Sequence, residues 1–235
     1  MTVDAAGRMN KTVFVVVPIF NEGPVIESTL KPLIDRGYSV VAVDDGSSDD
    51  TWAAIRSLPL YSLRHAINLG QGASLQTGTA FALAKGAEFV VHFDADGQHN
   101  PDDIEVLLDP LRRGEADVAL GSRFLRDADR RAVPRAKRLL LRTGRVVNGA
   151  LTGMWLSDAH NGFRALTREA AAKIELRENR FAHASEILAR IREAKLRFVE
   201  RPTAIVYTER SVAKGQPMWN SIKIVFDMLL RRIFR

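Results

Sequence analysis

Hydrophobic residues in the first half of the chain follow two periods in alternation. Short apolar runs rich in β-branched residues predict buried strands, and they occupy 13–18, 38–43, 60–65, 89–93 and 117–120. Between them, apolar residues recur at helical spacing and predict helices from Pro24 to Gly37, through Trp52 and Leu58, from Gly72 to Gly86, and over 101–113. This alternation predicts an α/β fold with a mainly parallel sheet and helices on both faces, because right-handed crossovers join parallel neighbours.

The second half of the chain has fewer such signals. A polar turn with glycine at its centre lies at 158–164, and the pattern beyond it predicts a helix over 182–194 and a strand over 198–207 that Pro202 interrupts. The tail, 218–235, carries apolar residues at helical spacing among lysines and arginines, which predicts a basic amphipathic helix that packs back on the domain or binds a membrane surface or partner. We therefore expect a flexible N-terminus over 1–12, one domain over 13–216 and a C-terminal amphipathic helix over 217–235.

Polar residues follow three of the predicted strands at the point where each strand ends. These residues are Asn21 and Glu22, Asp44 and Asp45, and Asp94 and Asp96. Because the carboxyl ends of parallel strands meet at one edge of a sheet, and ligands of α/β proteins bind there, the three pairs predict a shared binding crevice.

Asp94 and Asp96 are separated by one residue and followed by glycine. If the extended geometry persists, residues two apart point the same way, so the two carboxylates face one spot and repel unless a cation joins them. A hard divalent cation suits carboxylate oxygens, and Gln98 adds a neutral oxygen ligand. The alternative is an aspartate-rich turn that caps the helix beginning near Pro101.

Composition narrows the class of protein. The chain has 235 residues, of which 46% are hydrophobic, and this is enough for a core. It has no cysteine, so disulfides and thiolate metal sites are excluded. The first twelve residues do not resemble a secretory signal, and no run approaches the roughly 20 apolar residues of a membrane span. We expect a cytoplasmic protein, either soluble or peripheral on a membrane.

The charge of the chain favours an anionic partner. The net charge is +6, and the stretch 123–145 holds nine basic residues against two acidic ones. Such a stretch is either a solvated helix face or a contact for phosphate or lipid. Few aromatic residues accompany it and no nucleic-acid-binding module is recognisable, which argues against a nucleic-acid partner. The G-x-G-x-x-G and P-loop fingerprints of nucleotide-binding proteins and an H-x-x-x-H zinc pattern are also missing.

Six short motifs follow one another along the chain. They are VPIFNE at 17–22, VDDGSSD at 43–49, NLGQG at 68–72, DADGQ at 94–98, GSR at 121–123 and NGFRA at 161–165. Each motif alone is weak, but six in this order are specific, and over roughly 13–215 the chain resembles the family 2 glycosyltransferases. It is closest to the polyprenyl-phosphate sugar synthases of the dolichyl-phosphate mannose synthase type. The resemblance implies a GT-A fold, a Rossmann-like domain that holds a metal and a nucleotide diphosphate.

Carried over residue by residue, the resemblance implies a nucleotide-sugar site. Its donor-binding residues are Pro18, Phe20, Asn21, Glu22, Asp44, Asp45, Gln71, Asp94, Ala95, Asp96 and Lys214. Asp94 would lie by the ribose and the metal, while Asp96 and Gln98 would bind Mg²⁺ or Mn²⁺.

The remaining implied residues serve the acceptor and the leaving group. Arg123 would hold an acceptor phosphate, helped by Lys137 or Arg138, and Arg210 would lie with Lys214 over the donor diphosphate on a mobile loop. The implied catalytic set is thus Asp94, Asp96, Arg123 and Arg210.

Two departures from the family pattern bear on the choice of donor. Gln71 stands where lysine is common, and the late motif reads SVAKGQ at 211–216 instead of a serine followed directly by lysine. Both occur in what looks like a bacterial branch that builds surface polysaccharides. Many relatives also carry membrane helices after the catalytic domain, so a small membrane protein is an expected partner beside an anionic membrane surface.

The implied reaction moves a sugar from a UDP- or GDP-sugar to a polyprenyl phosphate, with inversion at the anomeric carbon. A lipid monophosphate is largely ionised at neutral pH, since its second pKa is about 6 by analogy with phosphoserine, and it needs no general base. The alternative acceptor is a sugar hydroxyl of a polysaccharide, which does need a base, and Asp158 or Glu186 are the candidates. A basic nucleic-acid-binding protein is the distant alternative.

Overall fold

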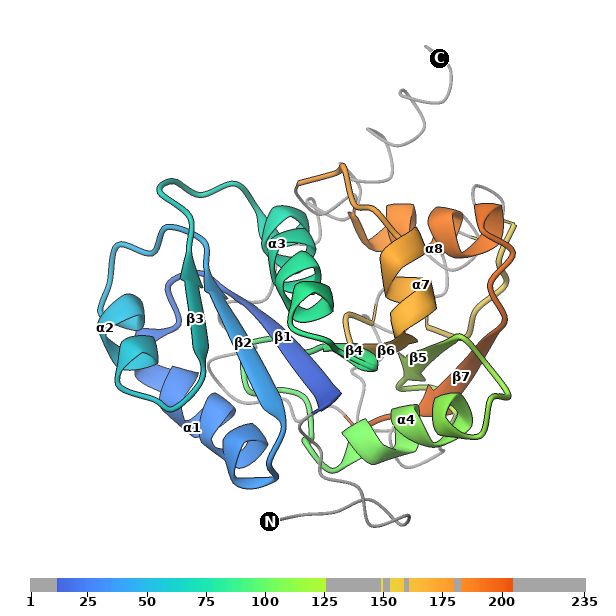
Figure 1. The fold of residues 1–235 in the computed structure, drawn as a ribbon, viewed down its shortest axis with the longest axis horizontal. Coiled ribbons are helices and arrows are strands. Elements are labelled where there is room, and N and C mark those ends of the chain that lie inside the picture. The colour runs from blue at the N-terminus through green and yellow to red at the C-terminus, as the bar shows by residue number, and fades with distance from the viewer. Residues whose placement is uncertain (1–11, 126–148, 150–152, 159–160, 180–182, 205–235) are drawn as a thin grey trace.

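A computed structural model describes residues 12–125, 149, 153–158, 161–179 and 183–204 (Figure 1). Seven strands form one sheet in the order β3-β2-β1-β4-β6-β5-β7. Their bounds are β1 Val13–Ile19, β2 Ser39–Asp44, β3 Tyr61–Arg64, β4 Phe89–His92, β5 Val118–Ser122, β6 Arg164–Thr167 and β7 Phe198–Pro202. The helices are α1 Gly23–Asp35, α2 Thr51–Arg56, α3 Gln71–Ala84, α4 Asp103–Arg112, α7 Arg168–Lys173 and α8 His183–Glu193. The fold is therefore α/β, as the alternating periods predict.

The sheet is parallel except at one strand. β1 pairs in parallel with both β2 and β4, β2 with β3, and β5 with β7. β6 runs antiparallel to β4 and β5, between which it lies. Neither β6 nor α7 is predicted by the sequence pattern, because β6 has only four residues, begins with an arginine and passes directly into the helix. The predicted mainly parallel sheet is thus confirmed with one antiparallel insertion.

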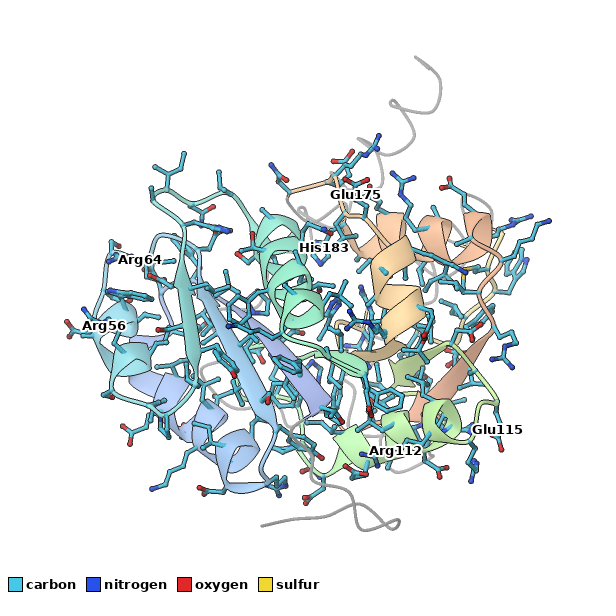
Figure 2. All side chains as sticks on the ribbon, viewed as in Figure 1. Arg56, Arg64, Arg112, Glu115, Glu175 and His183 are labelled. Carbon is cyan, nitrogen blue, oxygen red and sulfur yellow. The ribbon has the colours of Figure 1, made fainter. Side chains whose placement is uncertain are left out.

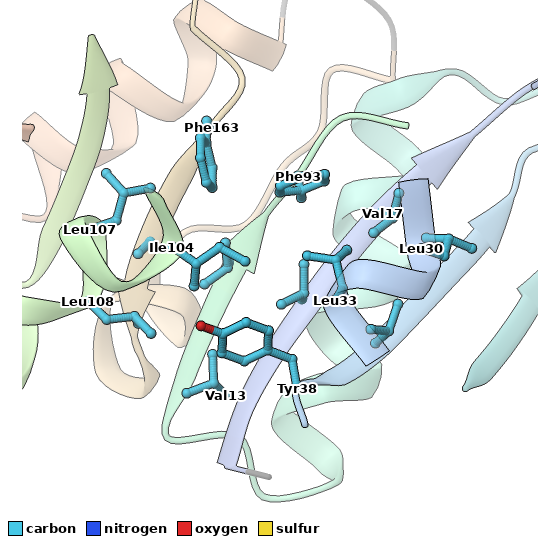
Figure 3. Packing of buried hydrophobic residues seen from close by; sticks show 14 of the residues in the cluster. Val13, Val17, Leu30, Leu33, Tyr38, Phe93, Ile104, Leu107, Leu108 and Phe163 are labelled. Carbon is cyan, nitrogen blue, oxygen red and sulfur yellow. The ribbon is translucent and has the colours of Figure 1, made fainter. Parts of the chain in front are cut away.

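Helices cover both faces of the sheet, and the alternation of β1 shows how. Val13, Val15 and Val17 point to one core with residues of α1 and α4, while Phe14 and Val16 point to a second core with residues of α3, α7 and α8. Figure 3 shows the first of these cores, where Leu30 and Leu33 of α1 and Ile104 of α4 lie over β1 and β4. Because strand side chains alternate, this entirely apolar strand is buried on both sides.

α3 packs directly against the sheet, and Gly78 leaves the room for this contact. A Cβ atom at position 78 would lie 2.3 Å from Cγ1 of Val16 and 3.1 Å from Cγ2 of Val43. Any larger side chain would push α3 away from β1 and β2. This contact matters for function because the first residue of α3, Gln71, lies at the carboxyl edge of the sheet.

Several predicted features lie outside the described residues. They are residues 1–11, most of the basic stretch, residues 205–207 of the predicted 198–207 strand, and the amphipathic tail. The observed strand β7 ends at Pro202, and residues 203–204 of the predicted strand are not part of it. In the part of the chain that the structure describes, no helix combines the length and apolar character needed to cross a membrane.

His92 of β4 is buried in the second core beside an arginine. Its side chain is 3% exposed, and its Nε2 lies 3.1 Å from Oγ1 of Thr79. It stands opposite Arg164 in the β4–β6 register. Burial, and after it the positive charge of Arg164, lowers the pKa of His92 to about 3. The imidazole is therefore neutral in the folded protein at any pH near 7.

The buried histidine predicts a measurable pH dependence of stability. An unfolded histidine protonates near pH 6.5 and folded His92 only near pH 3, so the free energy of unfolding falls as pH decreases from about 6.5 toward 3. Between pH 7 and pH 5 the wild type should lose about 2 kcal/mol more than a His92→Gln variant, which has no proton to bind. Urea unfolding at the two pH values measures this difference, and parallel losses in both proteins would contradict it.

Candidate functional site

The carboxyl ends of β2, β1 and β4 form one edge, and the predicted polar pairs gather there. The sheet order places these three parallel strands side by side. The backbone N–H of Asp45 donates to the carbonyl of Ile19 (2.8 Å), and that of Phe93 donates to the carbonyl of Val16 (3.0 Å). The convergence predicted from the α/β rule is therefore present in the structure.

The loop after β1 is tied to the loop after β2. The backbone N–H of Asn21 donates to Oγ of Ser47 (2.9 Å), and Oδ1 of Asn21 accepts from the backbone N–H of Ser48 (3.0 Å). The backbone N–H of Glu22 donates to Oγ1 of Thr51 (2.9 Å). Asn21 has a φ of 55°, a left-handed conformation that asparagine tolerates better than most residues. Pro18 is buried within β1 and Phe20 is 45% exposed at the edge.

Asp44 and Asp45 are buried and hold the neighbouring loops. Oδ1 of Asp44 accepts from the backbone N–H of Ser47, and its Oδ2 lies 3.0 Å from Nε of Arg64. Asp45 accepts from the backbone N–H groups of Leu69 (3.0 Å) and Gly70 (2.7 Å). The family resemblance implies nucleoside contacts for both aspartates, and the structure adds that Asp45 holds the NLGQG loop that leads into α3.

Asp94 is held from two sides. Its Oδ1 accepts from Nε2 of Gln71 (2.9 Å), and its Oδ2 lies 3.0 Å from Nε2 of His99. Its side chain is 30% exposed. Burial alone would raise its pKa, but the hydrogen bond and charge of His99, with the charge of Arg164, outweigh burial and lower the pKa of Asp94. Asp94 is therefore an ionised acceptor at neutral pH.

Asp96 has a different environment. Its carboxylate accepts from the backbone N–H of Gln98 (3.1 Å) and from the side-chain amide of Gln98. Burial, and after it the negative charge of Asp94, raises the pKa of Asp96. The ionised form of Asp96 is therefore less favourable in the folded protein than in water.

The oxygen ligands at this edge fit a divalent cation. Among the described residues no group of three or more histidine, cysteine or acidic side chains is arranged to hold a metal. Mg²⁺ and similar hard cations are often held by one or two carboxylates together with water and substrate phosphates, and they do not require such a cage. A cation beside Asp96 would favour its ionised form, which burial and the charge of Asp94 disfavour, and the amide of Gln98 would turn over to present its oxygen.

Gly162 of the NGFRA motif leaves room for Asp94. A Cβ atom at position 162 would lie 2.5 Å from Oδ2 and 2.9 Å from Oδ1 of Asp94. The sequence places Gly162 in a motif but does not explain why a glycine is needed there, because Asp94 lies far away in the chain. His99 is a second residue that the sequence analysis did not select, although it lies within a few residues of the aspartate pair.

Gln71 and the start of α3 are fixed by a loop from the other side. Gly72 donates its backbone N–H to the carbonyl of Asn179 (2.9 Å), and a Cβ atom at position 72 would lie 2.9 Å from Cβ of His183. His183 begins α8 and lies beside the N-terminal end of α3 (Figure 2). Glu186 of α8 accepts from the backbone N–H groups of Arg177 and Glu178 and so holds this loop. Glu186, a candidate base, thus positions the segment that covers Gly72.

Arg123 and Asp158 form a buried ion pair. Nε of Arg123 lies 2.6 Å from Oδ2 of Asp158, and Nη2 lies 2.6 Å from Oδ1. The two side chains are 8% and 1% exposed. Glu200 of β7 accepts from the backbone N–H groups of Ser157 and Asp158 and fixes the loop that carries the aspartate. Both carboxylate oxygens of Asp158 accept hydrogen bonds from Arg123. This arrangement is more typical of a structural ion pair than of a general base.

This ion pair predicts a large stability effect. Asp158→Ala leaves the Arg123 guanidinium buried without its carboxylate, so it should lower the free energy of unfolding by about 3–5 kcal/mol. Replacing both partners, as Arg123→Met with Asp158→Leu, should cost less than Asp158→Ala alone because no buried charge remains. Urea unfolding of the three proteins measures both effects, and a double variant that loses more than the single one would contradict this account.

Four of the predicted site residues lie outside the described residues. They are Lys137, Arg138, Arg210 and Lys214. Their assignment to the acceptor phosphate and the donor diphosphate stays a prediction.

The chain is similar in sequence to known proteins of one family. Residues 14–175 match the family described as "Glycosyl transferase family 2". A UDP-N-acetylglucosamine–dolichyl-phosphate N-acetylglucosaminyltransferase of Methanococcus voltae is 28% identical over 95% of this chain and 97% of its own length. A polyprenol monophosphomannose synthase of Mycolicibacterium smegmatis is 31% identical over 73% of this chain and 68% of its own length.

A solved structure supports the fold. Glucosyl-3-phosphoglycerate synthase from Mycobacterium tuberculosis, in complex with Mn²⁺, UDP and phosphoglyceric acid, superposes with a TM-score of 0.65 at 19% identity, covering 93% of this chain and 78% of that one. The predicted GT-A-like architecture of the α/β domain is confirmed by this similarity.

Proposed function

Because the chain belongs to glycosyltransferase family 2, and is thus an enzyme that transfers sugars, we propose that it moves a sugar from a UDP- or GDP-sugar to a polyprenyl phosphate. The observation that carries this proposal is the carboxylate pair at the shared edge of β2, β1 and β4, in a chain whose named relatives use dolichyl and polyprenyl phosphates. The product serves the assembly of cell-surface glycans.

The donor occupies the carboxyl edge. Asn21, Asp45 and Asp94 would surround the nucleoside, and Asp96 and Gln98 would hold Mg²⁺ or Mn²⁺. When bound, the cation supplies a Lewis acid for the negative charge that grows on the departing diphosphate. The chain's own contribution is to orient the sugar nucleotide with its anomeric carbon toward the acceptor.

The acceptor phosphate enters from the side of β5 and β7. Its ionised oxygen attacks the anomeric carbon as the bond to the diphosphate breaks, and the configuration at that carbon inverts. An ionised phosphate needs no general base. This agrees with the engagement of both candidate bases, since Asp158 pairs with Arg123 and Glu186 holds a loop.

Arg123 takes part in acceptor binding through its position at the end of β5 and not as an unpaired cation. Its guanidinium donates two hydrogen bonds to Asp158, so the pair holds the end of β5 in a fixed position. Lys137 and Arg138 supply further positive charge for the phosphate. The protein acts at the cytoplasmic face of a membrane. An anionic lipid surface or a small membrane protein holds it there through the basic tail.

Turnover with matched acceptors tests the proposal. The protein is incubated with Mn²⁺, a panel of UDP- and GDP-sugars, and either a short polyprenyl phosphate or the corresponding polyprenol, and release of nucleoside diphosphate is measured. Release that depends on the lipid phosphate is the expected result. Release with polyprenol or with a saccharide acceptor, and none with the phosphate, would replace the proposal with a hydroxyl acceptor.

A further inference from the structure

His99 is a buried histidine with a single polar contact in the described part of the chain. Its residue exposure is 6%, and its ring lies 5.4 Å from that of Phe93 and 4.7 Å from that of Phe163. Nε2 lies 3.0 Å from Oδ2 of Asp94, whereas Nδ1 is buried and has no hydrogen-bond partner among the described residues. Burying a polar ring with one nitrogen unpaired is unfavourable. The hydrogen bond to Asp94 is therefore the interaction that a histidine makes here and an apolar residue could not make.

The direction of this hydrogen bond is fixed by its acceptor. A carboxylate only accepts, so the hydrogen lies on Nε2 of His99 and is donated to Asp94. The rings of Phe93 and Phe163 fix the plane of the imidazole. Packing in the core therefore holds the Nε2–H group of His99 in the direction of Asp94.

Asp94 is immobilised by three contacts together. His99 engages Oδ2, Gln71 engages Oδ1, and Gly162 lies against both oxygens with no side chain of its own. Each carboxylate oxygen keeps a further lone pair for a ligand. Among the described residues, Asp96 by comparison accepts hydrogen bonds from the backbone and the side-chain amide of Gln98, two residues along the chain. The two aspartates are thus built differently, one fixed and one adaptable.

We propose that His99 is a positioning residue that fixes Asp94 for hydrogen bonding to the hydroxyls of the nucleotide donor, while Asp96 binds the metal without its help. The inference rests on the proposed function for the identity of the donor. It divides the two tasks of the carboxylate pair between the two residues. Loss of the His99 donor should then weaken donor binding and leave the metal requirement unchanged.

Two variants at one position separate positioning from packing. His99→Phe keeps a ring among Phe93 and Phe163 but has no N–H, whereas His99→Gln places an amide N–H near the position of Nε2. Calorimetric binding of UDP and GDP in the presence of Mn²⁺ should show about tenfold weaker binding for His99→Phe, the effect of losing a hydrogen bond to a charged group, and most of this should return in His99→Gln. The Mn²⁺ concentration that gives half-maximal nucleotide binding should stay within about twofold in both variants.

A wild-type protein that binds neither nucleotide contradicts the proposed function and with it this inference. A wild-type protein that binds, together with a His99→Phe variant that binds equally well, overturns the inference alone. Weak binding in both variants overturns it too, because the rescue by an N–H donor would be missing. Thermal unfolding of each variant confirms that the fold is intact.

Discussion

An Asp96→Asn variant is expected to lose sugar transfer by about 10³-fold while keeping the stability of the wild type. A metal that stabilises the departing diphosphate contributes several kcal/mol to the transition state, and about 4 kcal/mol corresponds to this factor. Stability should hold because burial and the charge of Asp94 raise the pKa of Asp96, so the charged form is unfavourable in the fold. Transfer rates at several Mn²⁺ concentrations, with thermal unfolding, measure both quantities.

Asp102 provides the matched control for this variant. It lies in the same segment as Asp96, but its side chain is 68% exposed and pairs with Arg36 on the surface. Asp102→Asn should retain the wild-type rate, because an exposed ion pair contributes about 1 kcal/mol or less. Wild-type turnover by Asp96→Asn would remove the metal assignment, whatever the control shows.

A Gly162→Ala variant is expected to lose about 10²-fold in transfer, although glycine has no side chain that could bind the donor or the acceptor. The new Cβ atom would lie 2.5 Å from Oδ2 of Asp94, closer than such atoms approach, so the carboxylate or the loop must move. A displacement of about 1 Å in an active site is enough for a loss of this size. Overpacking should also cost about 1–3 kcal/mol of stability. Steady-state kinetics and urea unfolding check the two effects.

A second glycine separates loss of stability from damage to the site. Gly114 has a φ of 69° and no atom within 4 Å of a Cβ built on it, so Gly114→Ala strains the backbone without a clash. It should cost about 1–2 kcal/mol of stability and leave transfer unchanged. If Gly162→Ala is equally unstable and equally active, the close approach to Asp94 has no catalytic consequence.

Much of the fold can be predicted from the sequence because its signals are local. The valine-rich β1 is buried on both faces and the turn residues that follow each strand are polar, so the parallel strands and their shared edge are predictable. β6 is not predictable in this way. It has four residues, one of them an arginine, and it becomes a strand only because β4 and β5 flank it.

The site could be predicted in its position but not in its contacts. Asp94 and Asp96 are visible as a pair, whereas the donors to Asp94 come from α3 and from a histidine that reads as an ordinary core residue. Arg123 is a second residue whose position could be predicted from the sequence and whose partner could not. Its place at a strand end suggests a phosphate contact, but its partner Asp158 lies 35 residues along the chain and only the fold brings the two together.

The chemical nature of the lipid product distinguishes transfer to a polyprenyl phosphate from transfer to a hydroxyl group. The product of the reaction with a polyprenyl phosphate and the preferred sugar nucleotide is purified, and its phosphorus and anomeric NMR signals are recorded. The expected product is a phosphodiester in which one sugar is joined to the lipid phosphate with the anomeric configuration opposite to that of the donor. A phosphate that remains a monoester, with the sugar on a hydroxyl group, would contradict the proposed function.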